Sequence, residues 1–199
     1  MKISKIEVQK RNKKRSSVYI DGEFKFGLDN EIILKYGLEE GSEIGEDQIK
    51  NILLAEEKQK IKQRAYRLLR YRGRSIAEMN ERLQRLGYEP EIVREVVNEL
   101  VGEGILDDQK FVRDFVSDYT NLKPKGNYFI LSELKKKGIA EEKIKEVINS
   151  RDEKRLINEL LRTKFKDLNV KNPKDKAKII RRLISRGFTP GVVYEVLAE

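Results

Sequence analysis

The sequence predicts a mostly α-helical protein, with tandem three-helix repeats in an elongated array and a small N-terminal β-hairpin or sheet. Three observations predict this fold class. Apolar residues recur with helical spacing at matching offsets from Gly87, Gly138 and Gly187, which stand about fifty residues apart. Residues 1–28 contain short segments that alternate apolar and polar side chains, as strands do. Charged residues form 39% of the 199-residue chain and hydrophobic residues 38%, which suits several small cores better than one large core.

Each repeat contains two apolar helical stripes before its glycine and one after it. The glycines themselves are expected to be left-handed residues that end a helix. The repeat offsets predict a buried core made of Ile61, Ala65, Leu68, Met79, Leu83, Val93, Val96 and Val97, then Val112, Val116, Tyr119, Ile130, Leu134, Ile144, Val147 and Ile148, then Leu161, Phe165, Leu168, Ile179, Leu183, Val193, Val196 and Leu197. Tyr88 and Phe188 are assigned to the core on the same grounds. We expect an N-terminal region over 1–57 and repeats over 58–108, 109–157 and 158–199.

The N-terminal region is expected to form three short strands. Asp21-Gly22 predicts a two-residue hairpin turn, because both central residues of such a turn need a positive φ. The stretch from Lys10 to Arg15 is predicted to be a loop, too charged to pack. Three strands alone are marginally stable, so the sheet should dock on the helices that follow. The first of these helices is expected over 29–38, and a second runs from Glu46 to about Arg72.

Two polar signals predict helix starts within the repeats. Ser75 and Glu78 have the spacing of a capping box, in which each side chain accepts a hydrogen bond from the other's backbone N–H. Asp107 and Asp108 precede a helix that starts near Gln109, and an aspartate there can cap its free N–H groups. The same pair could suggest a metal site, but two adjacent carboxylates without a third ligand are typical of a cap.

Composition excludes several kinds of chemistry. The chain has no cysteine and no histidine, which removes disulfides, thiol nucleophiles, the usual zinc sites and imidazole catalysis. It also lacks a Gly-x-x-x-x-Gly-Lys phosphate loop. We therefore expect no enzyme, no cofactor and no metal. With no apolar run of membrane-spanning length and no signal-peptide core, we expect a cytoplasmic monomer that does not bind membranes.

Basic and acidic blocks alternate along the chain. Residues 1–28, 58–86 and 119–199 are net basic, whereas residues 29–57 and 87–118 are net acidic. Basic faces attract nucleic-acid phosphates through counterion release. The acidic blocks would repel DNA and suit a protein partner. Charge runs are equally typical of helix faces that are simply solvated.

The strongest basic run extends from Lys58 to Arg74 and contains no acidic residue. We expect Lys60, Arg64, Arg67 and Arg74 to share one flank that follows a phosphate backbone, with Tyr66 or Tyr71 stacking on bases. An exposed helix kept soluble by arginine is the alternative. Basic residues at comparable places in the later repeats would extend the surface. The predicted nucleic-acid-binding residues are Lys60, Arg64, Arg67, Arg70, Arg72, Arg74, Lys125, Lys135, Lys136, Arg181, Arg182 and Arg186.

The ordered motifs resemble those of the RecX family, regulators of the bacterial RecA recombinase. The similarity rests on Gly104-Ile105-Leu106-Asp107-Asp108-Gln109-Lys110-Phe111-Val112, on Arg72-Gly73-Arg74-Ser75 and on the segments around Gly87, Gly138 and Gly187. It extends from about residue 60 to the C-terminus, and the N-terminal hairpin is similar to that of members from low-GC Gram-positive bacteria. One departure is Asn127-Tyr128-Phe129, where the family usually has a Pro-Arg-Arg-like start.

The resemblance implies binding in the groove of the RecA–single-stranded DNA filament and inhibition of ATP hydrolysis and strand exchange. It also implies weak, non-specific binding to single- and double-stranded DNA, and a role in DNA repair, homologous recombination and the SOS response. A stand-alone helix-turn-helix transcription factor is the alternative, and it would need a recognition helix rich in Arg, Asn and Gln. The third helix of each repeat is instead mixed or acidic.

Overall fold

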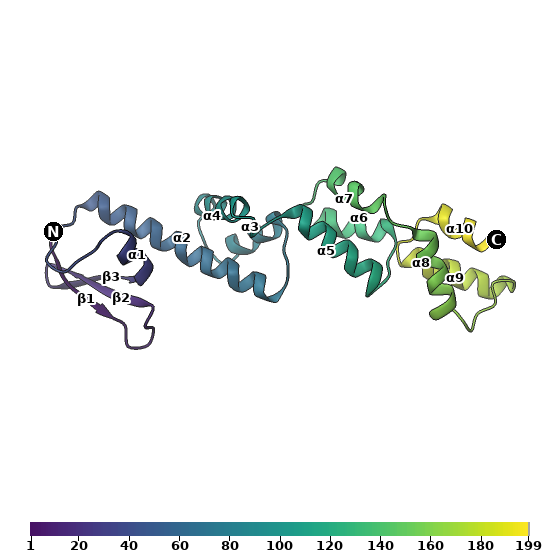
Figure 1. Cartoon of the computed structure of the whole chain (residues 1–199), viewed down its shortest axis with the longest axis horizontal. Helices are drawn as coiled ribbons and strands as arrows, with labels where there is room; N and C mark the ends of the chain where they lie inside the picture. The colour runs from purple at the N-terminus through teal and green to yellow at the C-terminus, as the bar shows by residue number, and fades with distance from the viewer. Residues whose placement is uncertain (199) are drawn as a thin grey trace. The chain divides into compact units, whose positions relative to one another are not determined.

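The computed structural model describes residues 1–198, and Glu199, the last residue of the predicted third repeat, lies outside the described residues. Strands β1 (Ile3–Val8), β2 (Arg15–Ile20) and β3 (Glu23–Asp29) come first in the described chain (Figure 1). The helices that follow are α1 (Asn30–Lys35), α2 (Glu46–Tyr71), α3 (Ile76–Gln84), α4 (Pro90–Gly102), α5 (Asp108–Asn121), α6 (Asn127–Lys136), α7 (Glu141–Ile148), α8 (Glu153–Thr163), α9 (Pro173–Ser185) and α10 (Pro190–Ala198). The predicted class, mostly α with a small N-terminal sheet, is confirmed.

The chain divides into two compact units. The first contains Met1–Arg72 and Arg82–Asn98, and the second contains Gly73–Glu81 and the chain from Glu99 onward. The sheet, α1, α2 and most of α4 therefore belong to the first unit. The start of α3 packs instead with the second unit, together with α5 to α10.

The N-terminal sheet is antiparallel with strand order β1-β2-β3. Asp21 and Gly22 join β2 to β3 with φ values of 50° and 86°, so the predicted hairpin turn is confirmed. Along β2 the buried residues alternate with half-buried ones, and Ser16, Val18 and Ile20 form the buried face. That face is the one that needs a partner, because a three-stranded sheet alone hides little apolar surface.

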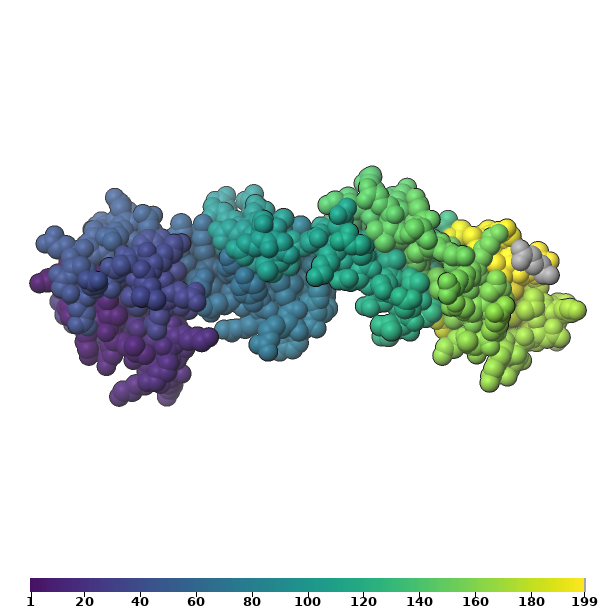
Figure 2. All heavy atoms as spheres, viewed as in Figure 1, coloured from purple at the N-terminus to yellow at the C-terminus, as the bar shows by residue number. Residues whose placement is uncertain are grey.

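The buried face of the sheet packs on the helices that follow it, as predicted. Val18 and Leu28 form a core cluster with Ile32 of α1 and Ile52 of α2, and all four are at most 5% exposed. Figure 2 shows the atoms of the sheet and α1, from purple to dark blue, gathered in one mass. The sheet and the first half of α2 therefore share a single apolar core.

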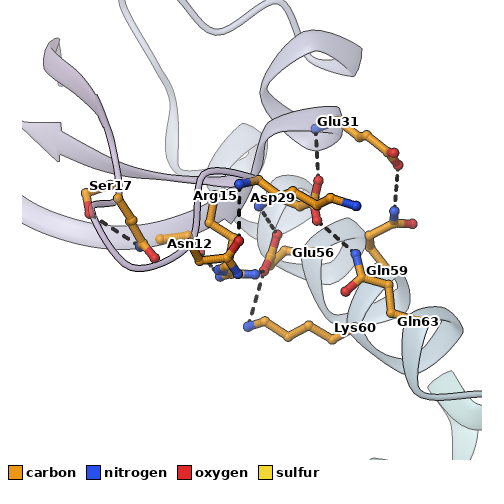
Figure 3. Close-up of polar contacts among 12 residues, drawn as sticks. Asn12, Arg15, Ser17, Asp29, Glu31, Glu56, Gln59, Lys60 and Gln63 are labelled. Carbon is orange, nitrogen blue, oxygen red and sulfur yellow. Dashed lines mark hydrogen bonds and ion pairs between the residues drawn. The ribbon is translucent and has the colours of Figure 1, made fainter. Parts of the chain in front are cut away.

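A buried carboxylate at the middle of α2 fastens the sheet to the helix (Figure 3). Glu56 is 3% exposed; its Oε1 accepts a hydrogen bond from Nη1 of Arg15 at 2.6 Å, and its Oε2 accepts one from the N–H of Asp29 at 2.7 Å. Two turns further along α2, Gln63 donates to Oδ2 of Asp29 at 2.8 Å. Asp29 also caps α1, since its Oδ1 accepts from the N–H of Glu31.

Two predictions about this unit are wrong in detail. Arg15 was predicted to lie in a charged loop, yet it begins β2, and its guanidinium also donates to the carbonyl of Gly27 at 2.7 Å. Because the buried carboxylate of Glu56 pairs with the Arg15 guanidinium, this side chain packs against α2. Arg74 was predicted to share a helix flank with Lys60, Arg64 and Arg67. Because α2 ends at Tyr71 and Arg72 is extended, Arg74 lies beyond the helix and in the second unit.

Repeats 2 and 3 each have their own core in the second unit. Val112, Ile130, Leu134 and Ile144 are fully buried in one cluster formed by α5, α6 and α7. The other cluster, formed by α8, α9 and α10, has Ile179 and Leu183 at its centre together with Phe165 and Phe188. These residues confirm the predicted offsets, while Tyr119, Val147, Leu161 and Leu168 are half-buried and pack against the same clusters.

The two predicted helix caps are present. The N–H of Glu78 donates to Oγ of Ser75 at 3.1 Å, and the N–H of Ser75 donates to Oε2 of Glu78 at 3.3 Å, which completes the capping box. Oδ1 of Asp107 accepts from the first-turn N–H groups of α5. Its neighbour Asp108 accepts instead from the N–H of Ile76 at 2.9 Å, and thereby ties α5 to the start of α3.

The three repeat glycines have φ values of 89° at Gly87, 75° at Gly138 and 79° at Gly187, so each is left-handed as predicted. They differ in their surroundings. A Cβ on Gly138 would overlap Ala77, and one on Gly187 would overlap the backbone of Phe129, whereas one on Gly87 would meet nothing. Gly138 and Gly187 therefore lie at contacts with the preceding repeat.

Both contacts, which we call joints, use equivalent positions. Ser75 and Gly126 each stand twelve residues before the glycine of their own repeat. Oγ of Ser75 donates to the carbonyl of Lys137 at 2.6 Å, and the N–H of Gly126 donates to the carbonyl of Arg186 at 3.0 Å. Each accepting carbonyl belongs to the residue just before the next repeat's glycine. The same hydrogen-bonding position therefore links repeat 1 to repeat 2 and repeat 2 to repeat 3.

Gly138→Ala should destabilise the second unit more than Gly87→Ala destabilises the first unit. Both variants force a side chain into a left-handed conformation, which costs about 1–2 kcal/mol. Only the alanine at position 138 also overlaps Ala77. Hydrogen exchange during denaturant unfolding, recorded separately for the amides of each unit, measures the loss in the free energy of unfolding for both variants. Equal costs, or no coupling between Gly138→Ala and Ala77→Gly in a double-mutant cycle, would contradict the joint contact.

Glu56→Ala should loosen the docking of the sheet. It removes the carboxylate that satisfies both the Arg15 guanidinium and the Asp29 N–H, so we expect a loss of about 3 kcal/mol in the free energy of unfolding of the first unit. The control is Glu57→Ala, at a half-buried position that forms no ion pair in the described chain, with an expected change below about 1 kcal/mol. Hydrogen exchange of the β2 amides provides the measurement, and similar rates in both variants would refute the role of Glu56.

Candidate nucleic-acid interface

The basic run of α2 lines a hollow of about 350 Å³ in the first unit. Lys60, Arg64 and Arg67 reach it from successive turns of α2. Asn12, from the β1–β2 loop, and Arg15, at the start of β2, form another wall. The remaining lining residues are Gln63, Leu86 and Tyr88. A hollow of this size lies within the range of ligand sites, about 300–1,000 Å³.

A second hollow of about 400 Å³ adjoins the first, because Arg64 and Arg67 line both. Its other lining residues are Arg70 and Tyr71. Tyr71 is 88% exposed and Tyr66 is 39% exposed, so the two tyrosines predicted to stack on bases both reach the surface. Of the two, Tyr71 is the one that lines the hollow with the arginines. A guanidinium row flanked by an exposed aromatic ring can bind a phosphate backbone together with a base.

The cations of the first unit differ in how far they are neutralised. Lys60 and Arg15 both lie against Glu56, at 3.4 Å and 2.6 Å. Arg64, Arg67 and Arg70 form no ion pair with any carboxylate among residues 1–198. Positive charge without an internal partner attracts anions from solution, and the attraction decreases with salt. The three arginines are therefore the part of this surface that is available to phosphate.

A third hollow, of about 440 Å³, lies in the second unit. Lys125 reaches it from the linker before α6, Lys164 from the end of α8, and Arg182 and Arg186 from the end of α9. Phe165 and Ser185 complete the lining. None of the four cations forms an ion pair within the described residues. The structure thus brings together Lys125, Arg182 and Arg186, which the sequence predicted separately.

The hollows of repeats 1 and 3 occupy corresponding places. Arg64 stands 23 residues before Gly87, and Lys164 stands 23 residues before Gly187. The residue just before each glycine, Leu86 or Arg186, also lines the hollow of its repeat. In repeat 2 the position equivalent to Arg64 is Phe115, an apolar residue packed against the core. Repeat 2 therefore has no cation at this position.

Other predicted residues lie outside these hollows. Lys135 pairs with Glu141, and Lys136 pairs with Glu133 at 2.7 Å. Hydrogen bonds from Lys135 and then Lys145 lower the pKa of Glu141 to about 2, so this carboxylate stays charged over the whole neutral range. Both lysines are thus engaged with carboxylates of their own repeat.

Arg181 and Arg72 are exposed and Arg74 is half-buried, and none of the three lines one of the hollows. Of the twelve residues predicted to bind nucleic acid, the hollows therefore unite Lys60, Arg64, Arg67 and Arg70 in the first unit, and Lys125, Arg182 and Arg186 in the second.

Sequence reasoning missed several lining residues. Lys164 could have been found, because it has the offset of Arg64 within its repeat. Tyr88 was predicted in the core on its offset, but it is half-buried and lines the hollow. Asn12 and Arg15 had no sequence signal, since a contact between the β1–β2 segment and α2 depends on tertiary packing.

The unusual start of α6 has a structural role. Oδ1 of Asn127 accepts from Nη1 of Arg151 at 2.5 Å, and the N–H of Asn127 donates to the buried carboxylate of Glu153 at 2.6 Å. Arg151 also donates to the carbonyl of Lys125 at 2.9 Å. Burial lowers the pKa of the Arg151 guanidinium, which nevertheless stays charged. Asn127 therefore anchors the linker that presents Lys125.

The described residues bring no three His, Cys, Asp or Glu side chains together as metal ligands. Within residues 1–198, no helix has the length and apolar character needed to cross a bilayer.

Comparison with known proteins places these features in a family. The chain matches the model of the regulatory protein RecX N-terminal domain over residues 1–45. The models of the first, second and third RecX three-helix domains match residues 62–100, 107–148 and 152–197. The three-helix repeats predicted from the glycine offsets are thereby confirmed.

Curated relatives extend over nearly the whole chain. Regulatory protein RecX of Halalkalibacterium halodurans is 30% identical over 99% of this chain and 77% of its own length. That of Bacillus subtilis is 31% identical over 96% of this chain and 74% of its own length, and that of Clostridium tetani is 31% identical over 94% and 88%.

Solved structures agree with these matches. A crystal structure of regulatory protein RecX covers 100% of this chain with a TM-score of 0.77 and 26% identity, and 99% of the solved chain is matched. RecX from Lactobacillus salivarius, with a TM-score of 0.62 over 72% of this chain and 96% of its own, shares the fold at 21% identity. With all four domain models matched in order and relatives similar along its whole length, the chain belongs to the RecX family of regulatory proteins.

Proposed function

We propose that this chain binds the RecA–single-stranded DNA filament and inhibits its ATP hydrolysis and strand exchange. In this proposal it also binds single- and double-stranded DNA weakly, without sequence preference, and it acts as a cytoplasmic monomer in recombinational DNA repair. Family membership supports the regulatory role. The observation that carries the nucleic-acid part is the row of Arg64, Arg67 and Arg70 on α2, which pair with no carboxylate among the described residues.

The chemistry of these arginines favours phosphate over base recognition. Arg64, Arg67 and Arg70 lie on successive turns of one helix, so they can contact successive phosphates of a strand. The described lining of the adjoining hollow adds one exposed aromatic ring, Tyr71, and stacking of that kind tolerates every base. Binding through such contacts depends strongly on salt and weakly on sequence.

The helix-turn-helix alternative lacks a suitable recognition helix. Cations beside the third helices pair with carboxylates: Lys58 lies 2.6 Å from Glu95 of α4, and Lys145 lies 2.6 Å from Glu141 within α7. The exposed positions of α10 include Tyr194 and Glu195. Helices that read base edges instead present arginine, asparagine or glutamine to the major groove.

Replacing Arg64, Arg67 and Arg70 with Gln should weaken binding to single-stranded DNA. The loss of three phosphate contacts should reduce the slope of log K against log salt by about 2, because each contact contributes about 0.7 on a single strand. The matched control replaces Arg94, Arg113 and Arg155, which line none of the three hollows, and removes the same net charge. Fluorescence anisotropy over a salt series measures the slopes. Equal slopes for the two triple variants would remove α2 from the interface.

The unmodified chain should inhibit the RecA ATPase at concentrations well below those that coat bare single-stranded DNA. Simultaneous contacts with several protomers of a filament raise the apparent affinity through effective concentration. The Arg64, Arg67 and Arg70 triple variant should then lose DNA affinity yet keep a measurable part of the inhibition. A coupled ATPase assay run beside a DNA-binding titration tests both points. Inhibition that appears only at DNA saturation, and falls in step with DNA affinity, would indicate competition for DNA instead.

A further inference from the structure

The two joints between repeats accept a hydrogen bond at the same carbonyl position but differ in charge. At the first joint, Nζ of Lys137 lies 2.9 Å from Oε1 of Glu78, and both side chains are largely buried. Lys137 stands just before Gly138, and Glu78 stands nine residues before Gly87. A carboxylate of repeat 1 therefore neutralises the cation at the end of α6 and adds an ion pair to the hydrogen bond from Ser75.

The equivalent pair at the second joint lacks its acid. Arg186, just before Gly187, corresponds to Lys137, but the position nine residues before Gly138 is Phe129. A Cβ on Gly187 would overlap the backbone and Cβ of Phe129, so this position lies directly against the glycine of repeat 3. The joint is closed by backbone hydrogen bonds, from Gly126 to Arg186 and from the N–H of Tyr128 to the carbonyl of Gly187, both at 3.0 Å.

The cations of the third hollow surround this second joint. Lys125 is the chain neighbour of Gly126 and belongs to repeat 2, where its ammonium lies 4.7 Å from the ring centroid of Phe129. Lys164, Arg182 and Arg186 belong to repeat 3. The buried carboxylate of Glu153 bonds to the N–H of Asn127 and forms no ion pair with these four cations. Repulsion between Lys125 of repeat 2 and the three cations of repeat 3 thus destabilises the joint. An anion bound between them would attract both sides and stabilise it.

We propose that this hollow is a phosphate site, and that a phosphate group bound there replaces the missing carboxylate and fastens repeat 3 to repeat 2. The anion contacts Lys125 on one side of the joint and Lys164, Arg182 and Arg186 on the other. Binding and joint closure are then coupled: the anion binds the closed joint more tightly, and closure is favoured in its presence. The inference rests on the proposed function in one respect, namely that the phosphate comes from a nucleic-acid backbone.

Hydrogen exchange of the full-length chain, without RecA, tests the site directly. The amides of Gly126 and Tyr128 report on the joint because they donate across it, and the β2 amides of the other unit serve as the reference. Inorganic pyrophosphate and a short oligothymidylate are the two probes, each compared with sodium chloride at equal ionic strength. At ten times its dissociation constant, the anion should slow exchange of the two joint amides about tenfold.

The Lys164→Gln/Arg182→Gln variant should abolish this protection, since both exposed side chains line the hollow. An Arg113→Gln/Lys143→Gln variant, at exposed positions away from the hollow, removes the same charge and should keep the protection.

Protection by both probes, or by the oligonucleotide alone, supports the site, and the second result assigns it to a phosphodiester. Protection that chloride reproduces, that survives in the Lys164→Gln/Arg182→Gln variant, or that is absent in the unmodified chain overturns it. Because RecA is absent, failure here leaves the filament proposal standing, and failure of ATPase inhibition leaves this site standing.

Discussion

The contacts between repeats in the second unit depend on a backbone carbonyl at the end of a helix, where it has no hydrogen-bond partner within that helix. In repeats 2 and 3 a left-handed glycine ends the second helix, and the carbonyl just before it accepts a hydrogen bond from the preceding repeat. At the second joint, backbone meets backbone so closely that neither Gly126 nor Gly187 has room for a Cβ. Contacts between backbone atoms allow little adjustment, because no side-chain torsion can absorb a displacement. The residues nearest these carbonyls are therefore constrained more strongly than the rest of the repeat surface.

The core of each repeat was predictable because its contacts are local in sequence and periodic. Leu83, Leu134 and Leu183 share one offset and are all fully buried. The glycines were predictable for a similar reason, since the end of an apolar stripe followed by glycine has one common backbone solution. Their second role could not be predicted from this pattern. Gly87 has the same conformation as Gly138 but open space around it, and only the fold tells the two apart.

The charged residues were harder to assign, because the role of a cation depends on which carboxylates lie next to it in the folded chain. Lys135 and Arg182 both lie in the last turn of a second helix, yet Lys135 pairs with Glu141 while Arg182 lines a hollow. Arg15 and Glu56 lie 41 positions apart in sequence, and nothing in either neighbourhood indicates their ion pair. About half of the predicted interface residues gather in the hollows, whereas Lys135 and Lys136 pair with carboxylates of their own repeat.

The ion pair that attaches the sheet to α2 also affects the adjoining surface. Glu56 orients Arg15 and lies within 3.4 Å of Lys60, and both cations line the hollow that Arg64 and Arg67 share. Long basic side chains normally lose rotamer freedom when they close on a ligand, and that entropy loss weakens binding. Here folding has already restricted two of them. The wall formed by Arg15 and Lys60 is thus held in place beside Arg64 and Arg67. The affinity of these two arginines for an anion therefore follows the integrity of the N-terminal sheet, and unfolding of the sheet would weaken the surface without altering either arginine.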